Sequence, residues 1–252
     1  MGSRYSFDGL MLNLTNISQL VFYRSTSDTI QTMSNIEILI EGETIQEIGP
    51  TVDNADEIID CSGRLVTPGF VDPHTHPVFY KGREEEYTMR LAGASYQEIA
   101  ENGGGILSSI KDVRNASEDE LVERVKKRMT RFIKLGTTTV EAKSGYGLDT
   151  ESELKSLRVL NRVNGDHPID IIPTFLGAHA FPPEFSDDPD GYVNLLCDEM
   201  IPAVGEQGIA QYCDVSCEKG YFSVEQSRRI LETGKTYGLI PRLHADEFED
   251  SG

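Results

Sequence analysis

The sequence predicts an α/β protein, in which a helix-covered and mainly parallel sheet follows a small N-terminal β-domain. From residue 65 onward, short apolar segments alternate with amphipathic helical segments, which is typical of parallel sheets. Residues 1–64 instead contain short strand patterns and turns, with no helix of useful length. A hydrophobic content of 38% over 252 residues is enough for a packed core. We therefore expect two domains, 1–64 and 65–252.

The N-terminal domain is predicted mainly from the segment NIEILIEGETIQEIG. Ile36, Ile38 and Ile40 alternate with polar residues, and the EGE triplet provides a turn. Ile45 and Ile48 then resume the apolar pattern. Because alternate residues of a strand share a face, this pattern predicts a hairpin with one buried face.

Helix starts in the second domain are indicated by capping boxes, in which a Ser or Thr is followed three residues later by Glu. The three candidates are Ser95 with Glu98, Ser117 with Glu120, and Thr150 with Glu153. Apolar stripes after the second and third candidates predict helices that end near Gly136 and Gly165. A further helix is predicted over residues 223–237.

Five apolar segments lie before and between these helices: RLVTPGFVD, TTTVEAK, IDIIPTFLGAH, QYCDVSCEKG and LIPRLHADE. Their alternation with helices fits two architectures, a closed (β/α)8 barrel and an open doubly wound sheet. No G-x-G-x-x-G pattern follows the first strand, which disfavours the open sheet.

The chain is strongly acidic, with 23 Lys and Arg against 42 Asp and Glu and a net charge of −19. Such a surface repels phosphate backbones and anionic lipids, so we expect neither nucleic-acid nor membrane binding. No apolar run approaches the roughly 20 residues of a membrane span, and the N-terminus has no signal-peptide pattern. The four cysteines form no C-x-x-C pair, and we expect reduced thiols in a cytoplasmic protein.

Four of the five histidines follow predicted strands. His74 and His76 end the first strand of the second domain, and they share a face because they are two residues apart. His179 ends the third strand, and His244 lies near the end of the fifth. The C-terminal ends of parallel strands form one rim, where the catalytic groups of such folds collect. Only His167 lies elsewhere.

This histidine pattern indicates a metal site. Neutral imidazoles together with a carboxylate are typical ligands of zinc or iron(II). An ion held by three protein ligands and a water would be catalytic, because it lowers the pKa of that water. Glu247, three residues after His244, is placed to accept the proton.

Several segments resemble a known family. TPGFVDPHTHPVF is similar to the first barrel strand of the amidohydrolase superfamily. SYQEIAENGGGI, GTTTVEAKSGYGLDTESELKSLRVL, TFLGAHAFPPE, CEKGYFS and LHADEF together resemble the imidazolonepropionase family. The resemblance runs from about Cys61 to the last residue, whereas residues 1–60 resemble the family's β-sandwich only loosely.

The resemblance implies a (β/α)8 metal-dependent hydrolase barrel with a small N-terminal β-sandwich domain. The family's pattern continues past Gly252 with three more barrel strands and a further aspartate ligand. Five strands cannot close an eight-strand barrel. We therefore expect the barrel to be incomplete in this chain, as in the N-terminal portion of the family's chain.

The resemblance also implies the reaction and the site residues. The reaction is hydrolytic opening of the ring of 4-imidazolone-5-propanoate to N-formimidoyl-L-glutamate in histidine degradation. One zinc or iron ion per subunit is implied, on the ligands His74, His76 and His244. The other positions are Glu247 as the acid/base carboxylate, and Arg83, Tyr96, Tyr146 and His179 as substrate contacts.

Two of these residues have an expected chemical role. His179 is expected to act catalytically by donating a hydrogen bond to the developing oxyanion. Arg83 is expected to bind the carboxylate tail of the substrate through its planar fork. The expected partners are the small-molecule substrate and, as an open question, a second copy of the chain in a homodimer.

Other interpretations stay open. Arg83 could pair only with the glutamates beside it, Tyr96 and Tyr146 could serve packing, and Lys143 could neutralise a buried carboxylate. The chain could also be another cyclic-amide hydrolase or aminohydrolase of the superfamily, or an inactive truncated metal-binding fragment.

Overall fold

The computed structural model describes residues 9–52, 55–94, 98, 104–247 and 250. The chain forms two compact units, residues 1–70 and residues 71–252, and each has its own hydrophobic core. The division falls a few residues after the boundary that the sequence predicts. The reason is that strand β7 (Leu65–Val66) pairs with strand β2 (Gln19–Arg24) of the first unit.

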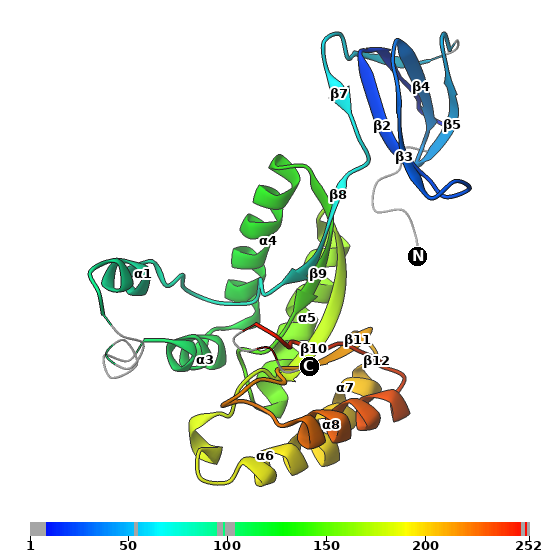
Figure 1. The fold of residues 1–252 in the computed structure, drawn as a ribbon. Coiled ribbons are helices and arrows are strands. Elements are labelled where there is room, and N and C mark those ends of the chain that lie inside the picture. Colours follow the sequence, from blue (N-terminus) through cyan, green and yellow to red (C-terminus); the bar gives the residue numbers. More distant parts are fainter. Residues whose placement is uncertain (1–8, 53–54, 95–97, 99–103, 248–249, 251–252) are drawn as a thin grey trace. The chain divides into compact units, whose positions relative to one another are not determined.

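The N-terminal unit is a small β-sandwich (Figure 1). Its other strands are β1 (Met11–Ile17), β3 (Thr29–Met33), β4 (Ile36–Glu41), β5 (Thr44–Gly49) and β6 (Glu57–Asp60). They form a four-stranded sheet in the order β5-β4-β1-β6 and a three-stranded sheet in the order β3-β2-β7. Side chains from both sheets meet in one core, whose buried members are Ile17, Leu20, Ile36, Ile38 and Cys61.

The predicted hairpin of this unit forms, but only one of its strands is buried. β4 and β5 pair antiparallel, and Ile36 and Ile38 are each 4% exposed. Ile45 and Ile48 on β5 are 57% and 42% exposed, so the expected shared buried face is wrong for β5. β5 lies at the edge of its sheet, and the core draws no buried side chain from it.

The second unit combines a five-stranded sheet with helices. Its strands are β8 (Phe70–Thr75), β9 (Thr137–Lys143), β10 (Asp170–Ala178), β11 (Tyr212–Val215) and β12 (Ile240–Pro241). Its α-helices are α1 (Glu84–Leu91), α3 (Ile106–Asn115), α4 (Glu118–Lys134), α5 (Thr150–Asp166), α6 (Pro189–Leu195), α7 (Ile201–Gln207) and α8 (Val224–Thr236). Two short segments complete it, the 3₁₀ turn η1 (Pro183–Phe185) and the π-helical η2 (Leu196–Met200).

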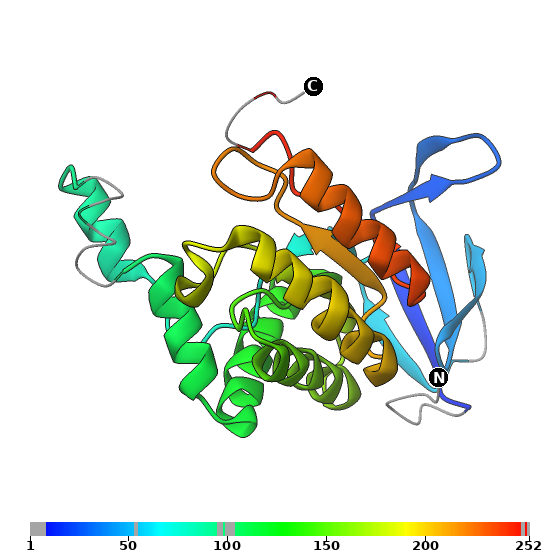
Figure 2. The same ribbon diagram turned by 90° about the horizontal axis from the view of Figure 1, so that it is seen from below.

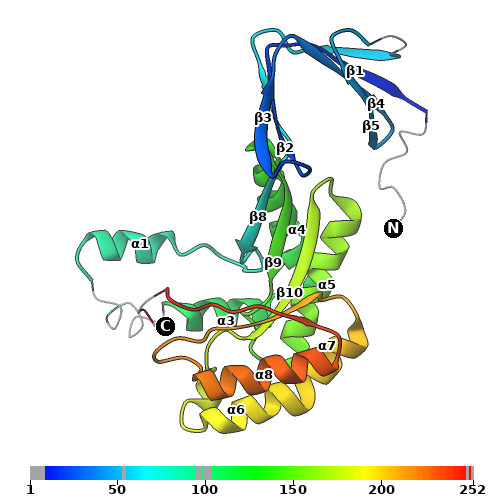
Figure 3. The same ribbon diagram turned by 45° about the vertical axis from the view of Figure 1, so that its right-hand side comes forward.

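The order of the strands decides between the two predicted architectures. The sheet runs β8-β9-β10-β11-β12, which is the order of the sequence, and Figure 3 shows β8, β9 and β10 side by side. The strands from β9 to β12 pair in parallel. A doubly wound sheet reverses its order at a switch point, whereas a barrel adds each strand beside the last. The chain therefore contains the first five strands of a (β/α)8 barrel, which is incomplete in the described residues.

Local sequence signals place two of the long helices correctly. α4 begins with the predicted capping box, in which Ser117 and Glu120 satisfy each other's backbone N–H groups. α8 begins with a similar box made by Ser223 and Gln226, and it lies beside α7 (Figure 2). The predicted box at Ser95 lies outside the described residues. Among the helices that the structure describes, none has both the length and the apolar character needed to cross a membrane.

Helix α5 begins differently from the prediction. Its N-cap is Asp149, whose side chain accepts a hydrogen bond from the backbone N–H of Ser152. The predicted capping box of Thr150 with Glu153 is therefore wrong. The carboxylate of Glu153 instead binds the backbone of the loop that precedes the helix.

Candidate metal centre and active site

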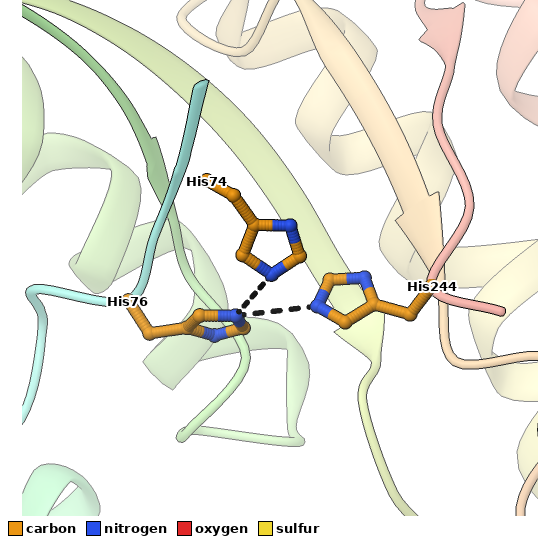
Figure 4. A group of neighbouring side chains, drawn as sticks. All are labelled: His74, His76 and His244. Carbon is orange, nitrogen blue, oxygen red and sulfur yellow. Dashed lines mark hydrogen bonds between the residues drawn. The ribbon is translucent and has the colours of Figure 1, made fainter. Parts of the chain in front are cut away.

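Three histidine rings converge at the C-terminal ends of the barrel strands (Figure 4). Nε2 of His76 lies 3.2 Å from Nε2 of His74 and 3.2 Å from Nε2 of His244. One ring nitrogen from each histidine lies within 4.8 Å of the other two. His74 lies in β8, His76 follows that strand directly, and His244 forms a parallel bridge with Ser216 beyond β12. The structure thus brings together the three residues predicted as ligands.

Two rings of this cluster, His74 and His76, have lowered pKa values. Burial, with a further contribution from the neighbouring histidines, lowers the pKa of His76 to about 2. Burial also lowers the pKa of His74. A proton on Nε2 of His76 can satisfy only one of the two nitrogens that face it, and lone pairs left facing each other repel. A divalent cation accepts all three lone pairs, so the donor set fits zinc or iron(II).

A buried charged network lies next to His244. Oδ2 of Asp214 lies 3.0 Å from Nδ1 of His244 and 2.8 Å from Nζ of Lys143. Nδ1 of His244 forms no aligned hydrogen bond in this arrangement, so the Asp214 contact is a close electrostatic one. Lys143 also pairs with Glu141, whose carboxylate accepts a hydrogen bond from Oγ1 of Thr174 at 2.7 Å. Lys143 therefore neutralises buried carboxylates, as one of the open interpretations has it.

The ionisation of Asp214 follows from its contacts. Burial alone would raise the pKa of its carboxyl group. The contact with His244 and the positive charge of Lys143 outweigh this effect and hold the pKa below its usual value. A carboxylate beside Nδ1 of a histidine favours the tautomer whose Nε2 is free to bind a metal.

Glu141 and Asp214 are functional candidates that the sequence analysis missed. A signal was present, since both are charged residues within the apolar segments TTTVEAK and QYCDVSCEKG. Alternate residues of a strand share a face, which also places Glu141 beside Lys143. Their link to His244 is invisible in the sequence because the residues come from different strands.

His179 directly follows β10, and its ring stacks on that of His76 with centroids 4.9 Å apart. Nδ1 of His179 lies 2.7 Å from the carbonyl oxygen of Gly145. Since a carbonyl oxygen only accepts, Nδ1 carries the proton. Burial lowers the pKa of His179 to about 4, so the ring is neutral near pH 7 and Nε2 has a lone pair. The neutral ring with the proton on Nδ1 presents an acceptor to the site, and donation to an oxyanion stays a prediction that requires a proton on Nε2.

Tyr146 and Arg83 lie near this histidine. The ring of Tyr146 is 5.1 Å from that of His179 and 6.2 Å from that of His76. Burial raises the pKa of Tyr146, which keeps its hydroxyl protonated. Arg83 precedes α1, and its side chain is 45% exposed and 4.0 Å from the carboxylate of Glu86. Burial is the largest influence on the pKa values of Tyr146 and His179, and the positive charge of Arg83 adds a smaller contribution that acts to lower both.

Glu247 lies on the exposed segment that follows His244. Its backbone N–H donates a hydrogen bond to Oε1 of Glu218 at 2.6 Å, so Glu218 holds this segment. Within the described residues, the cluster of ligand atoms consists of histidines alone, and Glu247 is not part of it. Tyr96 lies outside the described residues.

Curated relatives of this chain share one name. The imidazolonepropionase of Shouchella clausii is 50% identical over 224 residues, which are 85% of this chain and 50% of the relative. The imidazolonepropionase of Geobacillus kaustophilus is 47% identical over 251 residues, which are 96% of this chain and 59% of the relative. The chain belongs to the imidazolonepropionase family. It spans about half the length of the curated relatives it matches, and it corresponds to the N-terminal portion of the imidazolonepropionase chain. No protein-family profile matches it.

Solved structures share the fold of this imidazolonepropionase-family chain. A 5-methylcytosine deaminase from Klebsiella pneumoniae, liganded with 5-fluorocytosine, matches with a TM-score of 0.63 and 17% identity over 94% of this chain and 52% of its own. A mutant atrazine chlorohydrolase from Arthrobacter aurescens, complexed with zinc and atraton, matches with a TM-score of 0.56 and 14% identity over 92% of this chain and 52% of its own. At such low identity these likenesses establish the fold alone, which is the first part of a (β/α)8 barrel with an N-terminal β-domain.

Proposed function

We propose that the protein is a metal-dependent imidazolonepropionase, which opens the ring of 4-imidazolone-5-propanoate to give N-formimidoyl-L-glutamate. The observation that carries this proposal is the 46% to 54% identity with curated imidazolonepropionases. A histidine cluster on a barrel rim serves many reactions, and the fold by itself does not select one. Because the chain spans about half the length of these relatives, the activity is proposed for the whole protein.

The proposed metal ligands are His74, His76 and His244, for one zinc or iron ion per subunit. When bound there, the ion polarises a carbonyl group and lowers the pKa of a coordinated water towards neutrality. Support for this assignment comes from the convergence of three Nε2 atoms. Asp214 supports it too, because its carboxylate faces the other nitrogen of His244.

The proton transfers are proposed for Glu247. Its carboxylate takes a proton from the attacking water and delivers it to the ring nitrogen as the carbon–nitrogen bond of the ring amide breaks. The oxygen of the water ends in the new carboxyl group of the product, whose remaining proton is lost to solvent to give the carboxylate. Glu218 supports this role by holding the backbone of Glu247 in the segment after His244.

The substrate contacts are proposed for residues around His179. With Nδ1–H donated to Gly145, the free Nε2 of His179 accepts a hydrogen bond from an N–H of the substrate ring. The protonated hydroxyl of Tyr146 donates to the substrate, and Arg83 pairs with the propionate tail. Tyr96 is assigned to the same pocket from the family resemblance alone.

Turnover assays with matched substrates and variants test the proposal. Metal-loaded and chelator-treated protein are compared on 4-imidazolone-5-propanoate and on the same ring without the propionate tail. We expect turnover that needs metal and favours the substrate with the tail. His76→Ala should abolish turnover, whereas His167→Ala should retain it, because His167 lies away from the rim and contacts Thr130.

Two outcomes would replace the proposal. Turnover of tail-free cyclic amides or of exocyclic amines, without imidazolonepropionate turnover, would identify another hydrolase or aminohydrolase of the superfamily. A metal-loaded protein without turnover of any of these compounds would be a metal-binding protein and not an enzyme of this type.

A further inference from the structure

The loop between β9 and α5, residues 144–149, has a strained backbone. Gly145 has a φ of 103°, and Leu148 has a φ of 54°. A left-handed conformation is unfavourable for leucine and persists only where the surroundings over-determine it. The loop carries Tyr146, and its Gly145 carbonyl accepts the hydrogen bond of His179. The shape of this loop therefore decides how two residues of the site are presented.

Glu153 holds the loop from inside helix α5. Its side chain is completely buried, and its two oxygens accept hydrogen bonds from three backbone N–H groups of the loop. These are the N–H groups of Gly145, Gly147 and Leu148, at 2.8 to 3.2 Å. Every one of these backbone partners is a donor, which suits the acceptor oxygens of a carboxyl group. Burial raises the pKa of Glu153, and the hydrogen bonds from the loop act in the opposite direction. Because Asp149 caps α5, Glu153 is not required for the start of the helix.

Arg114 binds the carbonyl groups of the same loop, whereas Glu153 binds its N–H groups. Its Nε donates to the carbonyl oxygen of Gly147 at 2.7 Å, and its Nη2 donates to that of Leu148 at 3.2 Å. Space around the loop is also restricted: a Cβ atom at Gly145 would lie 2.9 Å from the carbonyl oxygen of Leu176 and 3.1 Å from Nδ1 of His179. The N–H groups of the loop are thus held by the carboxyl group of Glu153 and its carbonyl groups by the guanidinium of Arg114, and the backbone at Gly145 packs closely against His179.

We propose that Glu153 is a positioning residue, which places Tyr146 and selects the tautomer of His179 by fixing the loop 144–149. The connection is short, because Glu153 binds the N–H of Gly145 and the carbonyl of Gly145 binds Nδ1–H of His179. If Gly145 moves, Nδ1 loses its acceptor and the ring proton is free to reside on Nε2. The site would then present a donor where it now presents an acceptor. This inference rests on the proposed function only for its effect on turnover.

The test compares Glu153→Gln with a matched control. Glutamine keeps the size of the side chain but turns an N–H2 donor towards backbone N–H groups, which cannot accept it. Glu151→Gln removes a carboxylate from the same turn of α5, where Glu151 is 76% exposed and pairs with Arg158. The measurements are ¹⁵N NMR of the His179 ring, amide hydrogen exchange of the loop, melting temperature, and kcat and KM with imidazolonepropionate.

The expected result separates positioning from stability. In Glu153→Gln the His179 ring should change from the Nδ1–H form to a mixture that includes Nε2–H, and kcat should fall roughly 100-fold with a smaller change in KM. Amide exchange at Gly145, Gly147 and Leu148 should become about ten times faster, since a lost buried hydrogen bond amounts to roughly that factor. Glu151→Gln should match the wild type in each measurement.

Three outcomes complete the design. A folded Glu153→Gln variant with wild-type His179 signals, even at a lower melting temperature, would make Glu153 a stability residue only and overturn the proposal. If that variant does not fold, the wild-type protein decides: the three amides must be protected like those inside α5, and exchange as fast as in exposed loops overturns it. Absence of turnover in the wild type would count against the proposed function, while the tautomer change would still report on positioning.

Discussion

Replacing Asp214 with asparagine tests how the protein orients His244. Oδ2 of Asp214 lies 3.0 Å from Nδ1 of His244, and the Asp214 side chain is 1% exposed. The carboxylate favours a proton on Nδ1 and so leaves Nε2 as the metal ligand. Asparagine keeps the shape but removes the charge. Its amide N–H2 group, when turned to the ring, favours the opposite tautomer.

Two free energies are affected, and they are measured separately. Loss of a carboxylate partner of a metal-binding histidine costs about 10- to 100-fold in metal affinity, or about 1.4 to 2.8 kcal/mol. Removal of one partner from a buried ion pair costs about 3 to 5 kcal/mol of folding free energy. Asp214 pairs with Lys143 at 2.8 Å, and Lys143 keeps Glu141 as a second partner. We therefore expect a loss of stability near the lower end of that range.

The assay is a competition titration of zinc against a chromophoric chelator at pH 7, with chemical denaturation in parallel. Glu141→Gln is the matched control, because it also removes one carboxylate from Lys143 but does not contact His244. We expect both variants to lose stability and only Asp214→Asn to lose 10- to 100-fold in zinc affinity. Equal losses of affinity in the two variants, or no loss in Asp214→Asn, would refute the role assigned to the carboxylate.

Three further predictions concern the metal, the substrate tail and pH. Alanine at His74, His76 or His244 should lower the bound zinc or iron measured by elemental analysis, and unchanged metal content in all three variants would contradict the assignment. Arg83→Lys keeps the charge but loses the planar fork, so KM should rise more than kcat falls, because the tail is bound about equally in the ground and transition states; a wild-type KM would argue against Arg83 as the clamp. In metal-free protein the unfolding free energy should decrease as pH falls from about 6.5 towards 4. Histidines of the unfolded chain bind protons in this range. In the folded protein His76 and His179 stay unprotonated there, because their pKa values are about 2 and about 4. Each histidine contributes up to about 1.4 kcal/mol per pH unit, and denaturant unfolding at pH 7 and pH 5 should show the difference; equal stabilities would disprove it.

The features that the sequence predicted correctly depend on short-range interactions. The start of α4 follows from Ser117 and Glu120, which bind each other's backbone within one turn. Apolar periodicity likewise predicted the strands and the long helices, because each element must bury one face. The collection of His74, His179 and His244 on one rim followed from their places at strand ends, since parallel strands end on the same side of a sheet.

Only the tertiary structure decided the features that depend on distant partners. The order β8-β9-β10-β11-β12, which excludes a doubly wound sheet, comes from pairing between strands that are separated by whole helices. His76 meets His244 across 168 residues of sequence, and Asp214 meets Lys143 from a different strand. The spacing of Thr150 and Glu153 predicts a capping box, but Asp149 caps the helix instead. The carboxyl group of Glu153 binds the backbone N–H groups of the loop 144–149. The physical reason is that a buried charge goes to the partners that the completed fold surrounds it with, and those partners are absent from its own segment of sequence.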